Sequence, residues 1–207
     1  MLEAHDLAGH RGTTDLFTGV SFRVGAGSAL IVGGHNGSGK TTLLRMLAGL
    51  TAPAAGGIRW RGDPVHPFAP SLRRDVVFCG HSIALKDELT AEENVTSLLS
   101  LAGGVASQDA VRAALDEVSL GRQRALPARV LSAGQRRRVG LARLRLVRRP
   151  LWVLDEPHTA LDAAGSELLA SLVRSHLDEG GVAVAATHQP LGVAAHRVVT
   201  LALGAAH

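Results

Sequence analysis

The residues best suited to chemistry form a glycine-rich loop between a short apolar run and a helical pattern. The loop fits the pattern GxxxxGK(S/T). Its glycines leave backbone N–H groups free to surround a phosphate, and the start of the following helix favours an anion. Lys40 supplies a mobile cation for the β- and γ-phosphates, and the hydroxyl of Thr41 suits Mg²⁺, which prefers hard oxygen ligands. We therefore predict an ATP site made of Gly34, His35, Asn36, Gly37, Ser38, Gly39, Lys40, Thr41 and Thr42.

Two carboxylates end a second apolar run, Leu151 to Leu154. Asp155, at the end of a buried strand, can hold Mg²⁺ through water, and Glu156 can accept the proton of an attacking water. The alternative is a pair of solvated charges at a strand end. Because the same chain carries a phosphate loop, we predict Asp155 and Thr41 as metal ligands and Glu156 as a catalytic base, with Lys40 as the catalytic cation.

Two further segments point to phosphate. The segment Leu131 to Gln135 precedes an arginine-rich helical stretch, so Ser132 can cap a helix while Gly134 allows close approach of a backbone. His188 follows the apolar run Val182 to Ala186, at the sheet edge where ligands of open α/β sheets bind. A lone histidine is usually structural, but this one completes a set.

The elements that must position these residues alternate between strands and helices, which predicts an α/β domain with a mostly parallel sheet. Glycines bound most of the apolar runs. The expected strands are Leu2 to Ala4, Thr18 to Val24, Ala29 to Val32, Gly57 to Trp60, Val76 to Cys79, Leu151 to Leu154, Val182 to Ala186 and Arg197 to Leu203.

Between Thr90 and Gly121 the pattern is helical only, opened by the capping box at Thr90 to Glu93 and again by Ser107. We expect a helical lobe at about residues 85–150, inserted into a single domain that spans 1–207, because no repeat or low-complexity linker interrupts the chain.

Composition limits the other classes of function. The 207 residues carry 22 Lys and Arg against 18 Asp and Glu, a net charge of +4 that allows nucleic acid without requiring it. Aromatic residues make up 3% and Tyr is absent, which leaves little for base stacking. The single Cys79 excludes an internal disulfide and a thiolate zinc cage. Glu3 and Asp6 argue against a signal peptide, and no apolar run is long enough to span a membrane, so we expect a cytosolic location.

In combination, these motifs resemble those of the ATP-binding subunits of ABC transporters, over essentially the whole chain. Residues 34–41 correspond to the Walker A loop, 131–135 to the signature motif and 151–156 to Walker B. Thr159 to Asp162 corresponds to the D-loop, and His188 to the switch histidine.

The resemblance implies a P-loop NTPase fold with an ABC-type domain: a mostly parallel central sheet, an antiparallel β portion and a small helical lobe. It implies a homodimer arranged head to tail, with ATP held between Lys40 of one copy and Ser132 and Gly134 of the other. His188 would hold the γ-phosphate and the attacking water. The same resemblance implies that Gln135 and Asp162 also belong to the nucleotide site.

Local sequence narrows the resemblance to the heme-exporter ATPases of cytochrome c maturation. The matching segments are Gly80–His81, Leu89 to Asn94, Leu131 to Arg137 and Thr187 to Leu191. This implies a peripheral ATPase subunit on the cytoplasmic face of the cell membrane, bound to separate integral membrane subunits, that couples ATP hydrolysis to heme delivery or release. An ATPase of another ABC transporter is the alternative.

The chain departs from the family pattern in two places. His81 stands where most members have a glutamine that contacts Mg²⁺ or water. An imidazole can also hydrogen-bond water. The alternative is a surface histidine without a functional role. The usual adenine-stacking aromatic is missing near His10 or Arg11, either of which could stack.

Two other classes compete with the transport ATPase. Seven arginines between Arg136 and Arg149 could bind nucleic acid, but they follow the signature motif without any base-reading element, so we expect no nucleic-acid partner. The interval from Lys40 to Ser132 leaves no room for the long coiled-coil insertion usual in soluble ABC proteins. A small-molecule kinase would need no signature segment from a second copy.

Overall fold

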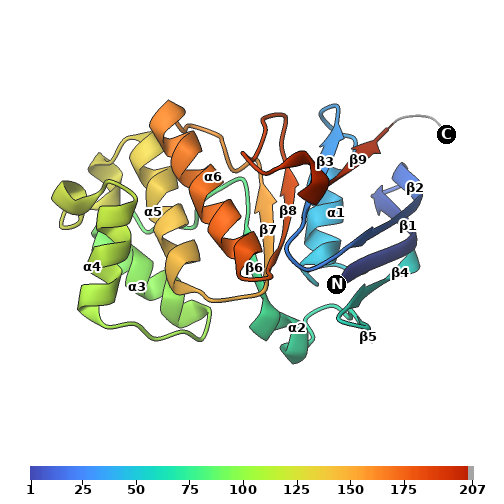
Figure 1. Ribbon diagram of the computed structural model, residues 1–207, viewed down its shortest axis with the longest axis horizontal. Helices are drawn as coiled ribbons and strands as arrows, with labels where there is room; N and C mark the ends of the chain where they lie inside the picture. The colour runs from blue at the N-terminus through green and yellow to red at the C-terminus, as the bar shows by residue number, and fades with distance from the viewer. Residues whose placement is uncertain (205–207) are drawn as a thin grey trace. The chain divides into compact units, whose positions relative to one another are not determined.

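The structure, a computed structural model, describes residues 1–204 (Figure 1). The last three residues of the domain expected at 1–207 lie outside that part. The chain divides into two compact units. The sheet unit comprises residues 1–78, 149–157 and 173–207, and the helical unit comprises 79–148 and 158–172. Whether they form one domain, as the sequence predicts, stays a prediction.

The sheet unit is built around a five-stranded sheet. Its strands, in spatial order, are β6 (Val76–Cys79), β7 (Leu151–Asp155), β8 (Val182–Ala186), β3 (Ala29–Gly34) and β9 (Val198–Leu203). The pairs β7–β8, β8–β3 and β3–β9 are parallel. Every residue of β7 and β8 is buried, which is why both read as continuous apolar runs. The predicted fold class is therefore confirmed.

An antiparallel sheet of four strands completes this unit. Its order is β2 (Thr14–Val24), β1 (Leu2–Arg11), β4 (Ala55–Trp60) and β5 (Asp63–Pro64). Two helices, α1 (Lys40–Leu47) and α2 (Pro70–Asp75), belong to the same unit. Buried side chains from both sheets and from α1, including Leu2, Leu7, Leu30, Leu43, Leu44, Leu47 and Leu151, form one hydrophobic core.

Several strand boundaries in this unit differ from the predicted ones: β2 and β4 begin earlier, at Thr14 and Ala55, and β3 and β7 end later, at Gly34 and Asp155. The first strand extends to Arg11 rather than ending at Ala4, because the left-handed backbone of Asp6 (φ 47°) and the register shifts beside it break the alternation that marks a strand. The short strand β5 and helix α2 were missed. The last strand begins at Val198, since residues Ala195–Arg197 form the 3₁₀ turn η3.

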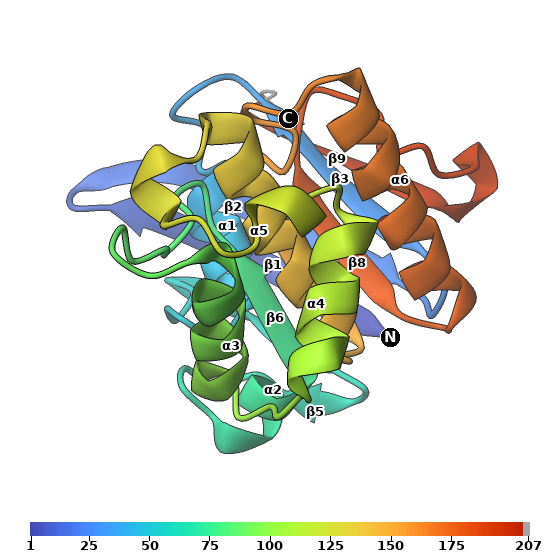
Figure 2. The same cartoon turned by 90° about the vertical axis from the view of Figure 1, so that its left-hand side faces the viewer.

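The helical unit contains α3 (Ala91–Leu101), α4 (Gln108–Glu117) and α5 (Ala133–Leu146), with the 3₁₀ turns η1 (Gly121–Gln123) and η2 (Ala128–Val130). All three helices pack against one another, and Figure 2 shows α3 and α4 facing the viewer with α5 beside them. The capping box at Thr90 and the cap at Ser107 are confirmed. Helix α6 (Ala163–Asp178) begins in this unit and ends in the sheet unit. Among residues 1–204, no helix is long and apolar enough to cross a membrane.

Candidate active site

The loop between β3 and α1 has the backbone of an anion cradle. Gly34, Gly37 and Gly39 have positive φ angles of 142°, 88° and 96°. A Cβ on Gly34 would lie 2.5 Å from Ser38 Oγ, and one on Gly39 would lie 2.8 Å from the ring of Phe17. No side chain caps the start of α1. Its first N–H groups are therefore available to an anion, which the positive end of the helix also favours.

Lys40 is folded back over this loop. Its Nζ donates hydrogen bonds to the carbonyl oxygens of Gly34 (2.6 Å) and His35 (3.1 Å), and the residue is only 9% exposed. An ammonium group has three donors. The loop carbonyls thus fix the cation above the turn, where it can meet a phosphate.

Thr41 and Asp155 are 114 positions apart in sequence, and the fold joins them directly. The Thr41 hydroxyl donates a 2.9 Å hydrogen bond to Oδ2 of Asp155, which is buried at the end of β7. The sequence paired these residues as metal ligands. A hydroxyl and a carboxylate in contact are hard oxygen donors of the kind Mg²⁺ takes with several waters, so the residues present fit that ion.

Glu156 lies just beyond β7 with a left-handed backbone (φ 47°), uncommon for a residue with a side chain. Its backbone N–H donates to the carbonyl oxygen of Ala186 at 2.9 Å, which ties it to the end of β8. Strained backbone of this kind clusters at functional sites. Glu156 is half-buried, and its backbone is held beside the ends of β7 and β8.

His188 follows β8 after the buried Thr187, and it is exposed. Strand β8 pairs with both β7 and β3: Ala186 lies opposite Asp155 on one side and Val32 on the other. The parallel register therefore brings Lys40, Thr41, Asp155, Glu156 and His188 to one sheet edge, all within the sheet unit.

In the helical unit, Ser132 and Gln135 open α5 with a reciprocal cap. Ser132 Oγ accepts from the backbone N–H of Gln135 (3.2 Å), and Gln135 Oε1 accepts from the backbone N–H of Ser132 (2.9 Å). The side-chain oxygen of Gln135, a residue expected to contact nucleotide, therefore serves to cap α5. Ser132 itself remains exposed at the helix start.

A pocket of about 350 Å³ lies beside this cap, lined by Ser132, Gly134, Gln135, Arg138, Ala160 and Asp162. A Cβ on Gly134 would stand 2.8 Å from the carbonyl oxygen of Ala160, so the glycine permits the close approach predicted from its type. Ala160 has φ 64°, a second non-glycine residue in left-handed backbone near a predicted motif.

Asp162 makes two hydrogen bonds that the sequence did not predict. Its Oδ1 accepts from the backbone N–H of Gly165 (2.8 Å) and from Nη2 of Arg138 (2.6 Å). The Gly165 hydrogen bond, followed by that from Arg138, holds the pKa of this carboxyl below its usual range. Sequence analysis missed Arg138 as a member of the pocket. Its position four residues after Gly134, on the same face of a helix, is the signal that could have found it.

His81 is exposed, and its backbone, not its ring, is anchored in the helical unit. The carbonyl oxygens of Gly80 and His81 accept from Nη1 of Arg137 at 3.4 and 3.3 Å, and Arg137 is 5% exposed. Other arginines of the cluster have protein partners too: Arg136 pairs with Asp87, Arg143 with Cys79 Sγ and Arg145 with Glu117. Much of the basic stretch therefore serves internal contacts.

The candidates for adenine stacking, His10 and Arg11, lie at the end of β1. His10 pairs with Asp15 and Arg11 with Thr14 across the hairpin to β2, and both side chains are exposed. Within residues 1–204, neither side chain stacks on an aromatic ring.

Comparison with known proteins agrees with these motifs. The family model described as ABC transporter matches residues 17–159. The "Cytochrome c biogenesis ATP-binding export protein CcmA" of Pseudomonas aeruginosa is 47% identical over 97% of this chain and 99% of its own length. The protein of the same name from Aromatoleum aromaticum is 50% identical over 91% of this chain and 89% of its own.

Among solved structures, a putative ABC transporter ATP-binding protein from Pyrococcus furiosus superimposes with a TM-score of 0.82. It is 25% identical, and the match covers 98% of this chain and 96% of that one. The expected resemblance is confirmed. The chain is an ABC-type ATPase that belongs to the ABC transporter family and, within it, to the cytochrome c biogenesis ATP-binding export proteins called CcmA.

Proposed function

We propose that this chain is the ATP-hydrolysing subunit of the heme exporter of cytochrome c biogenesis, and that it couples ATP binding and hydrolysis to heme delivery or release through separate integral membrane subunits. The observation that carries the hydrolytic part is the contact of Thr41 with Asp155 at the start of α1. It joins a phosphate loop to a buried carboxylate, the pair needed to hold Mg²⁺ beside a triphosphate.

In this proposal the loop amides and Lys40 neutralise the β- and γ-phosphates of ATP. Thr41 and Asp155 hold Mg²⁺, which supplies charge neutralisation at the phosphate oxygens when bound. Glu156, aligned by the Ala186 hydrogen bond, takes a proton from the attacking water as that water's oxygen bonds to the γ-phosphorus. The bond between the γ-phosphorus and the bridging oxygen breaks, ADP leaves with that oxygen, and the oxygen of the water becomes part of inorganic phosphate. His188 hydrogen-bonds the γ-phosphate and holds the water in line.

The helical unit supplies a second set of phosphate contacts in trans. Ser132 is the exposed N-cap residue of α5, at the positive end of a 14-residue helix, and it borders the pocket described above. We place these groups of one copy over the γ-phosphate held by the loop of another copy, in a homodimer. Asp162, fixed by Arg138 and Gly165, orients the segment that borders the pocket.

The membrane role is supported by the names of the relatives, which are ATP-binding export proteins of cytochrome c biogenesis. We place this chain on the cytoplasmic face of the cell membrane as a peripheral subunit, with the heme path in its membrane partners.

Glu156→Gln tests the hydrolytic assignment. The amide keeps the shape of the side chain but accepts no proton, so ATPase turnover should fall by about 10²–10⁴-fold while ATP still binds. Glu88→Gln, at an exposed position of the helical unit, is the matched control and should keep full activity. ATP hydrolysis by Glu156→Gln at the wild-type rate would refute the assignment.

The exporter assignment has a separate test. Cells that express the chain with its membrane subunits should accumulate mature c-type cytochromes, measured by heme staining, and cells that carry Glu156→Gln should not. Normal cytochrome maturation by a variant shown to lack ATPase activity would contradict the coupling.

A further inference from the structure

The phosphate loop carries one titratable side chain besides Lys40, the imidazole of His35. His35 directly follows Gly34 and is exposed, whereas Ser38, Gly39 and Lys40 are buried. A histidine side chain changes its charge close to neutral pH, which lysine and arginine do not. The proposed active site uses only the carbonyl oxygen of His35, which leaves its ring without an assigned role.

The ring of His35 is held in a defined orientation. Its Nδ1 lies 2.9 Å from the carbonyl oxygen of Asn36. Because a carbonyl oxygen only accepts hydrogen bonds, Nδ1 carries the proton of the neutral ring, and Nε2 is the nitrogen that can gain one. A Cβ on Gly204 would lie 2.9 Å from Nε2, so a glycine after β9 leaves room for the ring. The imidazole therefore lies between its own loop and the end of β9.

The position of Lys40 shows that this ring is close to where phosphates bind. Lys40 Nζ donates to the carbonyl oxygen of His35 at 3.1 Å. A phosphate oxygen that accepts from the same ammonium would be about 2.8 Å from Nζ, and hence about 6 Å or less from the His35 carbonyl oxygen. The imidazole of that residue is then separated from the phosphates by a distance on the order of the Debye length, about 8–10 Å in physiological salt. Salt therefore does not fully screen a charge on the ring from the triphosphate.

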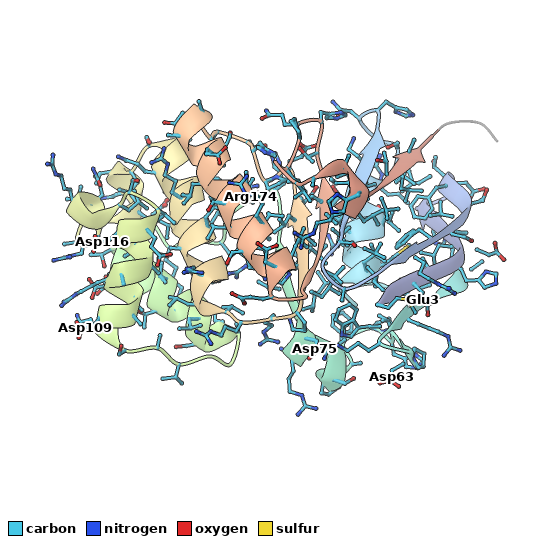
Figure 3. The ribbon with its side chains drawn as sticks, viewed as in Figure 1. Glu3, Asp63, Asp75, Asp109, Asp116 and Arg174 are labelled. Carbon is cyan, nitrogen blue, oxygen red and sulfur yellow. The ribbon has the colours of Figure 1, made fainter. Side chains whose placement is uncertain are left out.

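Lys40 is the charged group that the hydrogen bonds place nearest to His35. Strand β9 and the residue after it are uncharged. On the other side of β3, His188 follows β8, and Asp155 and Glu156 stand at the end of β7, one strand further away. Figure 3 shows three other carboxylates of this unit on the side away from the phosphate loop: Glu3, Asp63 and Asp75. The free site thus disfavours a second positive charge beside Lys40, and a bound triphosphate reverses that balance.

We propose that the protonated side chain of His35 is a second cation of the triphosphate site, so that the chain takes up a proton when it binds ATP. This inference rests on the proposed function, in the part that places ATP on the phosphate loop. The triphosphate neutralises Lys40 and attracts a proton from solvent to Nε2 of His35. No bond of ATP forms or breaks in this step. The charge of the imidazolium, which both ring nitrogens share, then attracts the phosphates without a direct hydrogen bond.

Proton uptake fixes the direction of the pH dependence. The ATP-bound chain binds more protons than the free chain, so by linkage the affinity for ATP rises as the pH falls through the range in which the ring titrates. The gain is present below that range and is lost as the pH rises above it. One pair of charges at this separation changes an equilibrium constant by about three- to tenfold. Through His35 alone, ATP should therefore bind about three- to tenfold more tightly at pH 6 than at pH 8.

A purely structural role for the ring predicts a different result. The hydrogen bond to Asn36 and the contact with Gly204 would then support the shape of the loop, and replacing His35 would change the affinity for ATP by the same factor at pH 6 and at pH 8. Variants that fix the charge separate the two roles. His35→Lys has a permanent positive charge and His35→Gln has none, and neither side chain titrates between pH 6 and pH 8.

The test measures the binding of AMP-PNP, a non-hydrolysable ATP analogue, with Mg²⁺ to the purified full chain by calorimetry at pH 6 and pH 8. The change in affinity between the two pH values should be about three- to tenfold smaller in His35→Gln than in the wild type. His35→Lys should keep the wild-type pH 6 affinity at pH 8. His66→Gln, at another exposed histidine of the sheet unit, is the matched control and should behave as the wild type. The titrations of the nucleotide and of His188 are common to all four proteins and cancel in this comparison.

The proton itself can be counted. Calorimetric titrations in two buffers of different ionisation enthalpy give the number of protons taken up per nucleotide. At pH 7 the wild type should take up about 0.3 protons more than His35→Gln, because the free ring is mostly neutral at that pH and the bound ring mostly charged. His66→Gln should take up as many protons as the wild type.

The outcomes distinguish this inference from the proposed function. Equal pH dependence and proton uptake in His35→Gln and the wild type would overturn the role of His35 and leave the proposed function intact. A loss of affinity in His35→Gln that is the same at pH 6 and pH 8 would also overturn it, in favour of a structural ring. Loss of the pH dependence in His66→Gln as well would assign the effect to the overall charge of the unit. A wild-type chain that binds no AMP-PNP at either pH would overturn both the inference and the proposed function.

Discussion

In the sheet unit the candidate site residues lie at the ends of buried parallel strands, whereas in the helical unit Ser132, Gly134, Gln135 and Asp162 lie at the N-terminal ends of the helices α5 and α6. Asp155 is 3% exposed and Lys40 is 9% exposed, while Ser132 and Asp162 are both exposed. The first set is held by strand register and by strained backbone at Glu156. The second is held by a capping box and by one ion pair.

This contrast matters for how each set tolerates change. A site built on strand ends depends on backbone that cannot move without disturbing the core. A site built on a helix cap depends on a few side-chain hydrogen bonds, each worth about 1 kcal/mol. Substitutions in the sheet unit should therefore affect nucleotide binding most, and those in the helical unit should divide between stability and catalysis.

The largest effect on nucleotide binding is expected for Gly39→Ala. The new methyl group would be forced into a φ of 96° and to 2.8 Å from Phe17, so the loop must change shape. ATP affinity, measured by calorimetry, should fall at least tenfold, a loss of about 1.4 kcal/mol or more. Gly12→Ala is the control, since its φ is 61° but nothing lies within 4 Å. Equal ATP affinity in the two variants would show that the loop tolerates the methyl group.

Asn94→Ala should be the most destabilising change in the helical unit. The buried amide donates to the carbonyl oxygens of Lys86, Leu89 and Thr90 and accepts from the N–H of Lys86. Its loss leaves buried backbone groups unpaired, and the free energy of unfolding in urea should fall by about 3 kcal/mol. Thr96→Ala, on the same helix, removes one exposed hydrogen bond and should cost at most about 0.5 kcal/mol. Similar urea midpoints for both variants would contradict the role of Asn94.

Two substitutions of Ser132 can distinguish its role as a helix cap from its proposed contact with the γ-phosphate. Ser132→Ala should lower the free energy of unfolding by about 1 kcal/mol through loss of the cap. Ser132→Asp restores a capping oxygen, so its stability should return, but its negative charge would repel the γ-phosphate of the proposed dimer. ATPase activity should therefore be lower in Ser132→Asp than in Ser132→Ala. Full ATPase activity in the Asp variant would remove this serine from the proposed phosphate contacts.

The smallest expected effect concerns pH and His176 in the sheet unit. This ring stacks on Trp152 with centroids 4.0 Å apart, and burial lowers its pKa below the ordinary value of 6.5. Because the folded state then binds fewer protons than the unfolded chain, the stability from neutral His176 is present above pH 6.5 and declines as the pH falls below it. Tm should drop between pH 7 and 5, and it should drop less in His176→Phe, which keeps the stacking. An equal Tm decrease in both proteins would assign the pH dependence to other groups.

Sequence patterns predicted the sheet unit well where strands are apolar throughout, as β6 and the fully buried β7 and β8 are. Strands β6 and β8 begin and end at the predicted residues, and β7 exceeds its prediction by one residue, Asp155. The pattern failed at β1, because the bulge at Asp6 reverses the side-chain alternation, and at α2, which is too short to show helical periodicity.

The pocket around Asp162 shows a different limit. The sequence marks Asp162 only as part of a motif, yet its oxygen serves both the Gly165 N–H and the Arg138 guanidinium. Arg138 is one of seven arginines in a short stretch, and no local rule distinguishes its partner from those of Arg136 or Arg145. Such ion pairs depend on which segments the fold brings alongside α5.

By itself, the sequence determined the phosphate loop, the three helix caps and the apolar strands, because glycine conformational freedom, capping chemistry and periodicity act within a few residues along the chain. Only the tertiary structure decided that Thr41 meets Asp155, that Glu156 is strained against Ala186, and that the ring of His35 lies beside Gly204 at the end of β9. Those contacts join positions distant in sequence, and their geometry follows from strand register and core packing, which no local pattern encodes.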